Sequence, residues 1–133
     1  MGEGNMNLLI DTHVLLWWLT DDLKLSRTAR DALMNEEHAV WVSAASAWEL
    51  STKARLGKLD QAKAILQSFD AMVNEEGFQH LPITYQHALY AGALESNHRD
   101  PFDRMLASQA ALEGYTLVTS DAAFQAFAIQ RLW

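Results

Sequence analysis

The chain has 133 residues, half of them hydrophobic, and this length is typical of one domain with its own core. The absence of cysteine excludes disulfides and thiolate metal sites, and no apolar stretch is long enough to span a membrane. The formal net charge of −7 argues against binding nucleic acid through overall positive charge, but it is compatible with a metal site made of carboxylates.

The first five residues do not resemble a signal peptide, because basic and apolar segments are both missing. We interpret residues 1–5 as a disordered start or a remnant of cloning, and we expect Met6 to begin the fold. The chain is therefore expected to form a single domain within residues 1–133 and to be cytoplasmic.

In the first half of the chain, short apolar runs alternate with helical patterns. In chain order, these predict a strand over Asn7–Ile10, helices over Thr12–Thr20 and Ser26–Asn35, a strand over Ala39–Val42, and helices over Ser46–Leu56 and Asp60–Glu76. The last two helices end before Gly57 and Gly77, and we expect them to form an antiparallel pair beside the sheet. Because Val14–Leu19 is apolar without a break, and includes Trp17 and Trp18, the first helix should be buried all round or contact a partner.

The second half continues the alternation. It predicts a strand over Phe78–Leu81, a helix over Thr84–Leu94, a polar loop over Glu95–Arg99, a helix from Asp100 to Gly114, a strand over Thr116–Thr119, a short helix over Ala122–Phe127 and a strand over Ile129–Trp133. Asp100 followed by Pro101 is a typical helix start. Alternating strands and helices indicate an α/β fold, in which helices cover both faces of a parallel sheet.

Five acidic residues lie just after predicted strands or near the starts of helices: Asp11, Glu49, Asp100, Asp103 and Asp121. Because the C-terminal ends of parallel strands share one edge of the sheet, these residues should converge there. Clustered carboxylates repel one another unless their pKa values rise or a cation binds. Mg²⁺ and Mn²⁺ prefer such oxygen ligands, and they promote phosphodiester hydrolysis by activating water and stabilising the leaving oxygen.

Each acid taken alone also fits a structural role. The three that stand directly before a predicted helix fit N-caps. Glu49 would complete a capping box with Ser46, and Asp103 would complement the dipole of its helix. Their expected convergence at one edge favours a metal site over five separate caps. None of the five histidines shows the spacing of a zinc site.

Four segments containing these acids occur in a distinctive order: Leu8–His13 (LLIDTH), Val42–Leu50 (VSAASAWEL), His98–Ala107 (HRDPFDRMLA) and Leu117–Asp121 (LVTSD). Their order, spacing and strand–helix context resemble the motifs of PIN-domain ribonucleases of the VapC toxin type. The resemblance extends from about Met6 to Trp133.

The resemblance implies a three-layer α/β/α fold with a central parallel sheet, and a Mg²⁺- or Mn²⁺-dependent endoribonuclease that is the toxin of a toxin–antitoxin pair. It implies a catalytic, metal-binding quartet of Asp11, Glu49, Asp103 and Asp121. Supporting roles fall to Asp100, Thr119 and Thr12. Candidate RNA contacts are Arg99, His98 and His13. The implied partners are an RNA substrate, a cognate antitoxin and a second copy of the chain.

Five basic residues near the motifs are candidates for phosphate contact in an otherwise acidic protein: Lys53, Arg55, Lys58, Arg99 and Arg104. Each also fits a solvated surface charge, and Lys53 fits an ion pair with Glu49 one helical turn away. We favour the surface interpretation for all of them except Arg99, for which both interpretations stay open.

Two other functions fit parts of the pattern. A metal-dependent phosphatase of the haloacid dehalogenase type would use Asp11 as its nucleophile, but this chemistry needs a second aspartate where the chain has His13. A non-catalytic binding module would use the acids only as helix caps. Hydrolysis of small phosphoesters without RNA cleavage would favour the first alternative, and absence of metal binding would favour the second.

Overall fold

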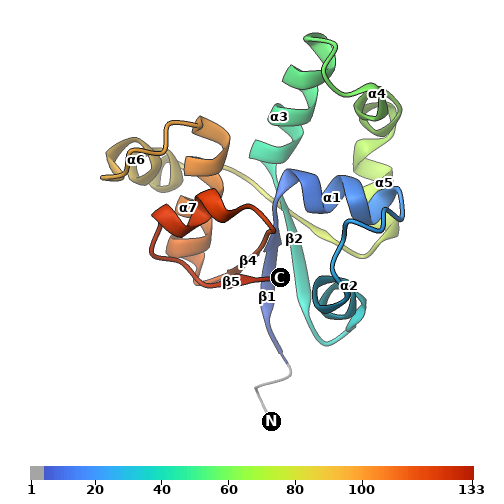
Figure 1. Cartoon of the computed structure of the whole chain (residues 1–133), viewed down its shortest axis with the longest axis horizontal. Coiled ribbons are helices and arrows are strands. Elements are labelled where there is room, and N and C mark those ends of the chain that lie inside the picture. Colours follow the sequence, from blue (N-terminus) through green and yellow to red (C-terminus); the bar gives the residue numbers. More distant parts are fainter. Residues whose placement is uncertain (1–4) are drawn as a thin grey trace.

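The computed structural model describes residues 5–133, so residues 1–4, which make up most of the predicted disordered start, lie outside the described residues. One sheet organises the fold (Figure 1). Its strands are β1 (Asn7–Ile10), β2 (Ala39–Ser43), β3 (Gln79–Leu81), β4 (Thr116–Val118) and β5 (Arg131–Leu132). They lie in the order β3-β2-β1-β4-β5, and all neighbours are parallel. The predicted central parallel sheet is therefore confirmed.

Helices cover both faces of this sheet. They are α1 (Thr12–Leu19), α2 (Arg27–Met34), α3 (Ala44–Arg55), α4 (Asp60–Gln67), α5 (Phe69–Glu75), α6 (Tyr85–Ala93), α7 (Pro101–Glu113) and the short 3-10 helix η2 (Ala122–Ala126). Helices α1 to α5 lie on one side, and α7, with α6 packed against it, lies on the other (Figure 1). This arrangement confirms the three-layer α/β/α fold.

The central strand β1 anchors two hydrophobic cores. Leu8 and Ile10 pack into the core beneath α1 to α5, whereas Leu9 packs into the core beneath α7. Successive side chains of a strand point to opposite faces, so an unbroken apolar run suits a strand covered on both sides. All three side chains are at most 1% exposed, which fixes the position of the residue that follows the strand. Among residues 5–133, no helix is both long and apolar enough to cross a bilayer.

The predicted single helix over Asp60–Glu76 is wrong, because Ser68 interrupts it with a non-helical backbone at φ −138° and ψ 35°. Ile65 and Val73 are both buried on the two sides of the break. In an uninterrupted helix, residues eight positions apart would point about 80° away from each other. The break at Ser68, a residue with a weak helix preference, lets both side chains reach the core.

The predicted start of the third helix is also wrong. Ser43 is the last residue of β2 and at the same time the N-cap of α3, since its Oγ accepts a hydrogen bond from the Ala45 N–H at 2.9 Å. The helix follows the strand without a loop, so Ser46 lies buried inside the helix. Glu49 therefore does not form the predicted capping box. The final strand is shorter than predicted, and the last helical turn is a 3-10 helix.

Candidate active site

Five acidic side chains from separate parts of the fold line one cavity at the C-terminal edge of the sheet. Asp11 follows β1 and Asp121 follows β4, while Glu49 lies on α3 and Asp103 on α7. The cavity has a volume of about 90 Å³ and is lined by Asp11, Thr12, His13, Glu49, Lys53, Asp100, Asp103, Asp121 and Phe124. The topology thus brings together acids that are up to 110 positions apart in the chain.

Three of these acids are helix caps as well as cavity residues. The Oδ1 atoms of Asp11, Asp100 and Asp121 accept hydrogen bonds from the first turns of α1, α7 and η2 at 2.8, 2.9 and 2.9 Å. Each of these N-caps uses a single carboxylate oxygen, so the second oxygen does not take part in capping. The capping and metal-binding interpretations of these residues are therefore compatible with each other.

Asp11 is buried, and hydrogen bonds reach both of its carboxylate oxygens. Its Oδ2 accepts a hydrogen bond from the Thr119 hydroxyl, and the Thr119 Oγ1 in turn accepts one from the Asp121 N–H at 3.0 Å. Burial raises the pKa of the Asp11 carboxyl, although the hydrogen bonds from Thr119 and from the Val14 N–H oppose the rise. Thr119 thereby ties the ends of β1 and β4 together behind the cavity.

Glu49 is buried between a hydroxyl and an ammonium group. Its Oε1 accepts a hydrogen bond from the Thr12 hydroxyl at 2.6 Å, and its Oε2 pairs with the Lys53 Nζ at 2.7 Å. The predicted ion pair between Glu49 and Lys53 is confirmed. Because Lys53 also lines the cavity, a positive charge stands among the carboxylates.

Asp103 is held by a histidine from the loop before α7. The His98 Nε2 lies 2.8 Å from Oδ2 of Asp103, and the His98 ring packs edge-on against Phe127 with ring centroids 5.5 Å apart. Burial, followed by the charges of Asp100 and Glu49, raises the pKa of Asp103 to about 6, while the contact with His98 opposes the rise. An elevated pKa in a polar cavity is typical of a functional site.

The donor set fits a hard divalent cation, because every acidic side chain in the cavity offers carboxylate oxygen. Within residues 5–133, however, no three carboxylate or imidazole groups surround a common point in these side-chain positions. Asp11, Glu49 and Asp103 are turned towards protein partners. A cation would therefore compete with Lys53 and His98 for the same oxygens.

The remaining sequence candidates do not line the cavity. Thr119 touches Asp11 and His98 touches Asp103 from outside the lining, and Arg99 is exposed in the loop before α7. Arg104 is neither a free phosphate ligand nor a solvated charge, because backbone carbonyls surround its guanidinium. Sequence reasoning did not find Phe124 as a lining residue, since its contact depends on how η2 folds over the site.

Comparisons with known proteins identify the family and the fold. The family model described as the PIN domain matches residues 8–130. Ribonuclease VapC22 from Mycobacterium tuberculosis is 33% identical over 117 residues, which cover 86% of each chain. Among solved structures, VapBC2 from Rickettsia felis, bound to a DNA fragment from its promoter, aligns with a TM-score of 0.69 and 16% identity over 95% of this chain and 97% of that one. VapBC-1 from nontypeable Haemophilus influenzae aligns with a TM-score of 0.65 and 19% identity, over 95% and 96% of the two chains.

These structures share the fold of the protein, while the family model and the VapC22 relative extend the likeness to the sequence itself. The matched residues 8–130 contain the whole sheet except Asn7 of β1 and the two residues of β5, and they include all five acids of the cavity. The chain therefore belongs to the PIN-domain family.

Proposed function

We propose that the protein is a Mg²⁺- or Mn²⁺-dependent endoribonuclease and the toxin of a toxin–antitoxin pair. The observation that carries the proposal is the cavity in which Asp11, Glu49, Asp103 and Asp121 meet. The relative VapC22 is named a ribonuclease and is similar along 86% of its length, which supports the same activity here.

In this proposal, the four acids hold the metal, which when bound would supply Lewis-acid activation of water and of the scissile phosphate. The protein's own groups prepare the ligands. Thr119 orients Asp11, and Thr12 orients Glu49, so two carboxylates are fixed by hydroxyl groups before any ligand arrives. Lys53 neutralises Glu49 and is the cavity cation best placed to move towards an RNA phosphate. We assign further RNA contacts to His13 in the lining and Arg99 on the exposed loop.

Substitution of single acids tests the activity. Asp103→Asn or Asp11→Asn should abolish cleavage of a structured RNA in the presence of Mg²⁺ or Mn²⁺ while the circular dichroism spectrum stays native. Asp31→Asn on the exposed surface of α2 is the matched control and should cleave normally, since it removes the same charge away from the cavity. Full activity of Asp11→Asn would reject the site, and an inactive parent protein would reject the function.

The phosphatase alternative is not favoured. The position that would need a second aspartate carries His13, whose ring packs against Trp17 with centroids 5.9 Å apart. A role of the acids as caps alone does not explain Glu49 or Asp103, whose carboxylates accept no helix-capping hydrogen bond.

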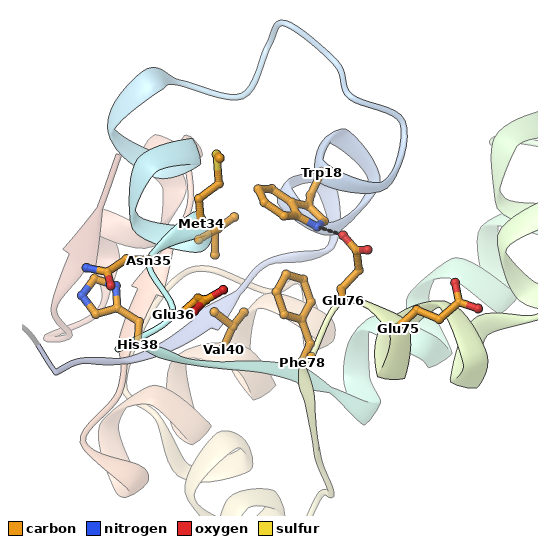
Figure 2. A pocket seen from close by; sticks show the side chains of 11 residues that line it. Trp18, Met34, Asn35, Glu36, His38, Val40, Glu75, Glu76 and Phe78 are labelled. Atoms are coloured by element: carbon orange, nitrogen blue, oxygen red, sulfur yellow. Dashed lines mark hydrogen bonds between the residues drawn. The ribbon is translucent and has the colours of Figure 1, made fainter.

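We further propose that a basic, amphipathic segment of an antitoxin binds a second pocket (Figure 2). This pocket shares no lining residue with the cavity of the active site. Figure 2 shows Trp18, Met34, Val40 and Phe78 around this pocket of about 530 Å³. Three glutamates line it as well: Glu36, Glu75 and Glu76. Apolar walls among carboxylates match a segment that carries both aliphatic and cationic side chains. The similar structures VapBC2 and VapBC-1 and a toxin–antitoxin complex from Klebsiella pneumoniae support a partner of this type.

The two adjacent tryptophans differ in their surroundings. Trp18 packs on Phe78 and donates its indole N–H to Glu76 at 2.5 Å, whereas Trp17 lies between His13 and Trp133. Trp18→Ala should therefore weaken binding of the proposed cognate antitoxin, and Trp48→Ala on the exposed surface of α3 should not. Equal binding by both folded variants would exclude this pocket.

The third partner that we propose is a second copy of the chain, which would form a homodimer through the exposed surface of α6. This helix contains no Asp, Glu, Lys or Arg. Tyr85, Ala88, Leu89 and Gly92 recur at helical spacing on its exposed side, where Tyr85 is 90% and Leu89 73% exposed. In a chain of charge −7, an uncharged face is the surface where two copies meet with least repulsion, and the small residues let bulky ones approach closely.

A further inference from the structure

Arg104 directly follows Asp103 on α7, yet its guanidinium reaches away from the cavity to backbone carbonyls. Nε and Nη2 donate to the Ala91 carbonyl at 3.1 and 2.9 Å, and Nη2 also donates to Leu94 at 2.7 Å. Nη1 donates to the carbonyls of Ser96 and His98 at 3.3 and 3.0 Å. A guanidinium has five N–H donors, and these five contacts match all of them.

The carbonyls belong to two connected pieces of chain. Ala91 lies in the last turn of α6 and Leu94 is its C-cap, where carbonyls lack partners within the helix and a positive charge is favourable. Ser96 and His98 belong to the loop that leads to α7. One side chain thus fixes both the end of α6 and the path of the chain into the active site.

His98 connects this network to the acids. Its carbonyl accepts from Arg104, its N–H donates to the Ser96 hydroxyl at 3.2 Å, and its Nε2 contacts Asp103 at 2.8 Å. The neighbouring residues Asp103 and Arg104 therefore hold the same histidine, one by its side chain and the other by its backbone. If the backbone of this loop moved, the imidazole would lose its place beside the carboxylate.

We propose that Arg104 is a positioning residue of the active site, which fixes residues 94–98 so that His98 orients the Asp103 carboxylate at the cavity. The inference rests on the proposed ribonuclease function. Lysine is not an adequate substitute, because a compact ammonium with three donors does not satisfy four separate carbonyls. Arg104→Lys and Arg104→Met should therefore both release the loop, although the first keeps the charge.

A second histidine provides an internal control for the experiment. His87 on α6 also contacts α7, through Nε2 at 2.8 Å from the Glu113 carboxylate, and its Nδ1 accepts from the Thr84 N–H. The proton of His87 therefore resides on Nε2, and none of the Arg104 hydrogen bonds involves this residue. General loosening of the two helices would disturb both histidines, whereas release of the loop would disturb only His98.

Nuclear magnetic resonance of ¹⁵N-histidine-labelled, metal-free protein tests the proposal without relying on activity. In both Arg104 variants, the signal of the proton between His98 Nε2 and the Asp103 carboxyl should broaden or vanish through exchange with water, while the Nε2–H signal of His87 persists. Retention of the His98 signal, or loss of both signals in both variants, would overturn the positioning role.

Kinetics with RNA provide the second measurement. The variants should lower kcat about tenfold to a hundredfold with little change in KM, since a small displacement of a catalytic group has effects of this size. Arg27→Met, which removes an exposed positive charge on α2, should leave both constants unchanged. Unchanged kcat in both Arg104 variants would reject the proposal. An inactive parent protein would reject the ribonuclease function instead, and the histidine signals would still decide the role of Arg104.

Discussion

At the scale of single residues, protein groups already balance much of the acidity of the site. Lys53 and His98 contact Glu49 and Asp103, and the Thr119 hydroxyl donates to Asp11. These contacts only partly compensate for burial, since the pKa values of Asp11 and Asp103 remain raised. Holding the carboxylates together therefore has an energetic cost in the metal-free protein, and this cost depends on pH.

We expect the metal-free protein to lose stability as the pH rises from about 4 to about 6. The pKa of Asp103 rises from 3.8 to about 6 on folding, so in this range the folded protein holds a proton that the unfolded chain has released. Stability falls with pH wherever the folded state binds more protons, here by about 3 kcal/mol at most for Asp103. Asp11 acts in the same direction.

Urea denaturation of the parent protein and of Asp103→Asn at several pH values measures this effect. Because asparagine does not titrate, the difference in unfolding free energy between the two proteins should change between pH 4 and 6 and level off above pH 7. Parallel pH profiles would show that the Asp103 carboxyl titrates as it does in the unfolded chain.

Some residues and contacts of the site can be predicted from the sequence, and others cannot. The four acids were predictable because each belongs to a motif at a strand end or helix start, and Lys53 follows Glu49 at helical spacing. The contact of His98 with Asp103 was not predictable, since the two are separated by a loop and a helix start whose path Arg104 determines. Side-chain contacts set by tertiary structure leave no periodic signal in the sequence.

At the scale of elements, the uncharged surface of α6 has a specific consequence for assembly. We expect the parent protein to be dimeric at micromolar concentration and Leu89→Glu to be monomeric, because a carboxylate on each copy would repel its counterpart across the contact. Leu23→Glu is the matched control, since Leu23 is 94% exposed in the loop between α1 and α2.

Sedimentation velocity of the three proteins distinguishes the outcomes. The control should sediment as the parent does, and native circular dichroism should show that both variants fold. A monomeric parent, or a dimeric Leu89→Glu variant, would contradict the assignment of α6 as the contact surface.

Most elements were predictable because their ends carry strong local signals. Asp100, Pro101 and Gly114 delimit α7 as predicted, and Gly114 has the left-handed conformation at φ 72° that favours glycine. The errors arose where packing overrode local preference. Ser68 breaks a continuous helical pattern, and Ser43 ends a strand and caps a helix at once, so no loop composition marks the boundary.

At the scale of the whole molecule, the fold concentrates part of the negative charge of the protein in one cavity. Five of the acids that contribute to the charge of −7 line one small space. A divalent cation that binds only the folded protein stabilises it by mass action, by about 2.7 kcal/mol at a concentration one hundred times its dissociation constant.

We therefore expect millimolar Mn²⁺ or Mg²⁺ to raise the melting temperature of the parent protein and to leave that of Asp11→Asn nearly unchanged. Differential scanning calorimetry measures the melting temperatures of both proteins. Samples in buffer that contains a chelator and no divalent metal give the reference. Equal shifts in the two proteins would indicate binding elsewhere on the acidic surface.

The position of β1 in the middle of the sheet also determines when the site can exist during synthesis. β1 pairs with β4, and both Thr119 and Asp121 follow β4 near the end of the chain. Asp11 and Glu49 are therefore synthesised well before Thr119 and Asp121, whereas Asp103 precedes Thr119 by only 16 residues. Since the hydroxyl that holds Asp11 and the fourth carboxylate both follow β4, the site cannot be complete before β4 has been synthesised and has paired with β1. Under the proposed ribonuclease function, a chain that stops before β4 would therefore be inactive.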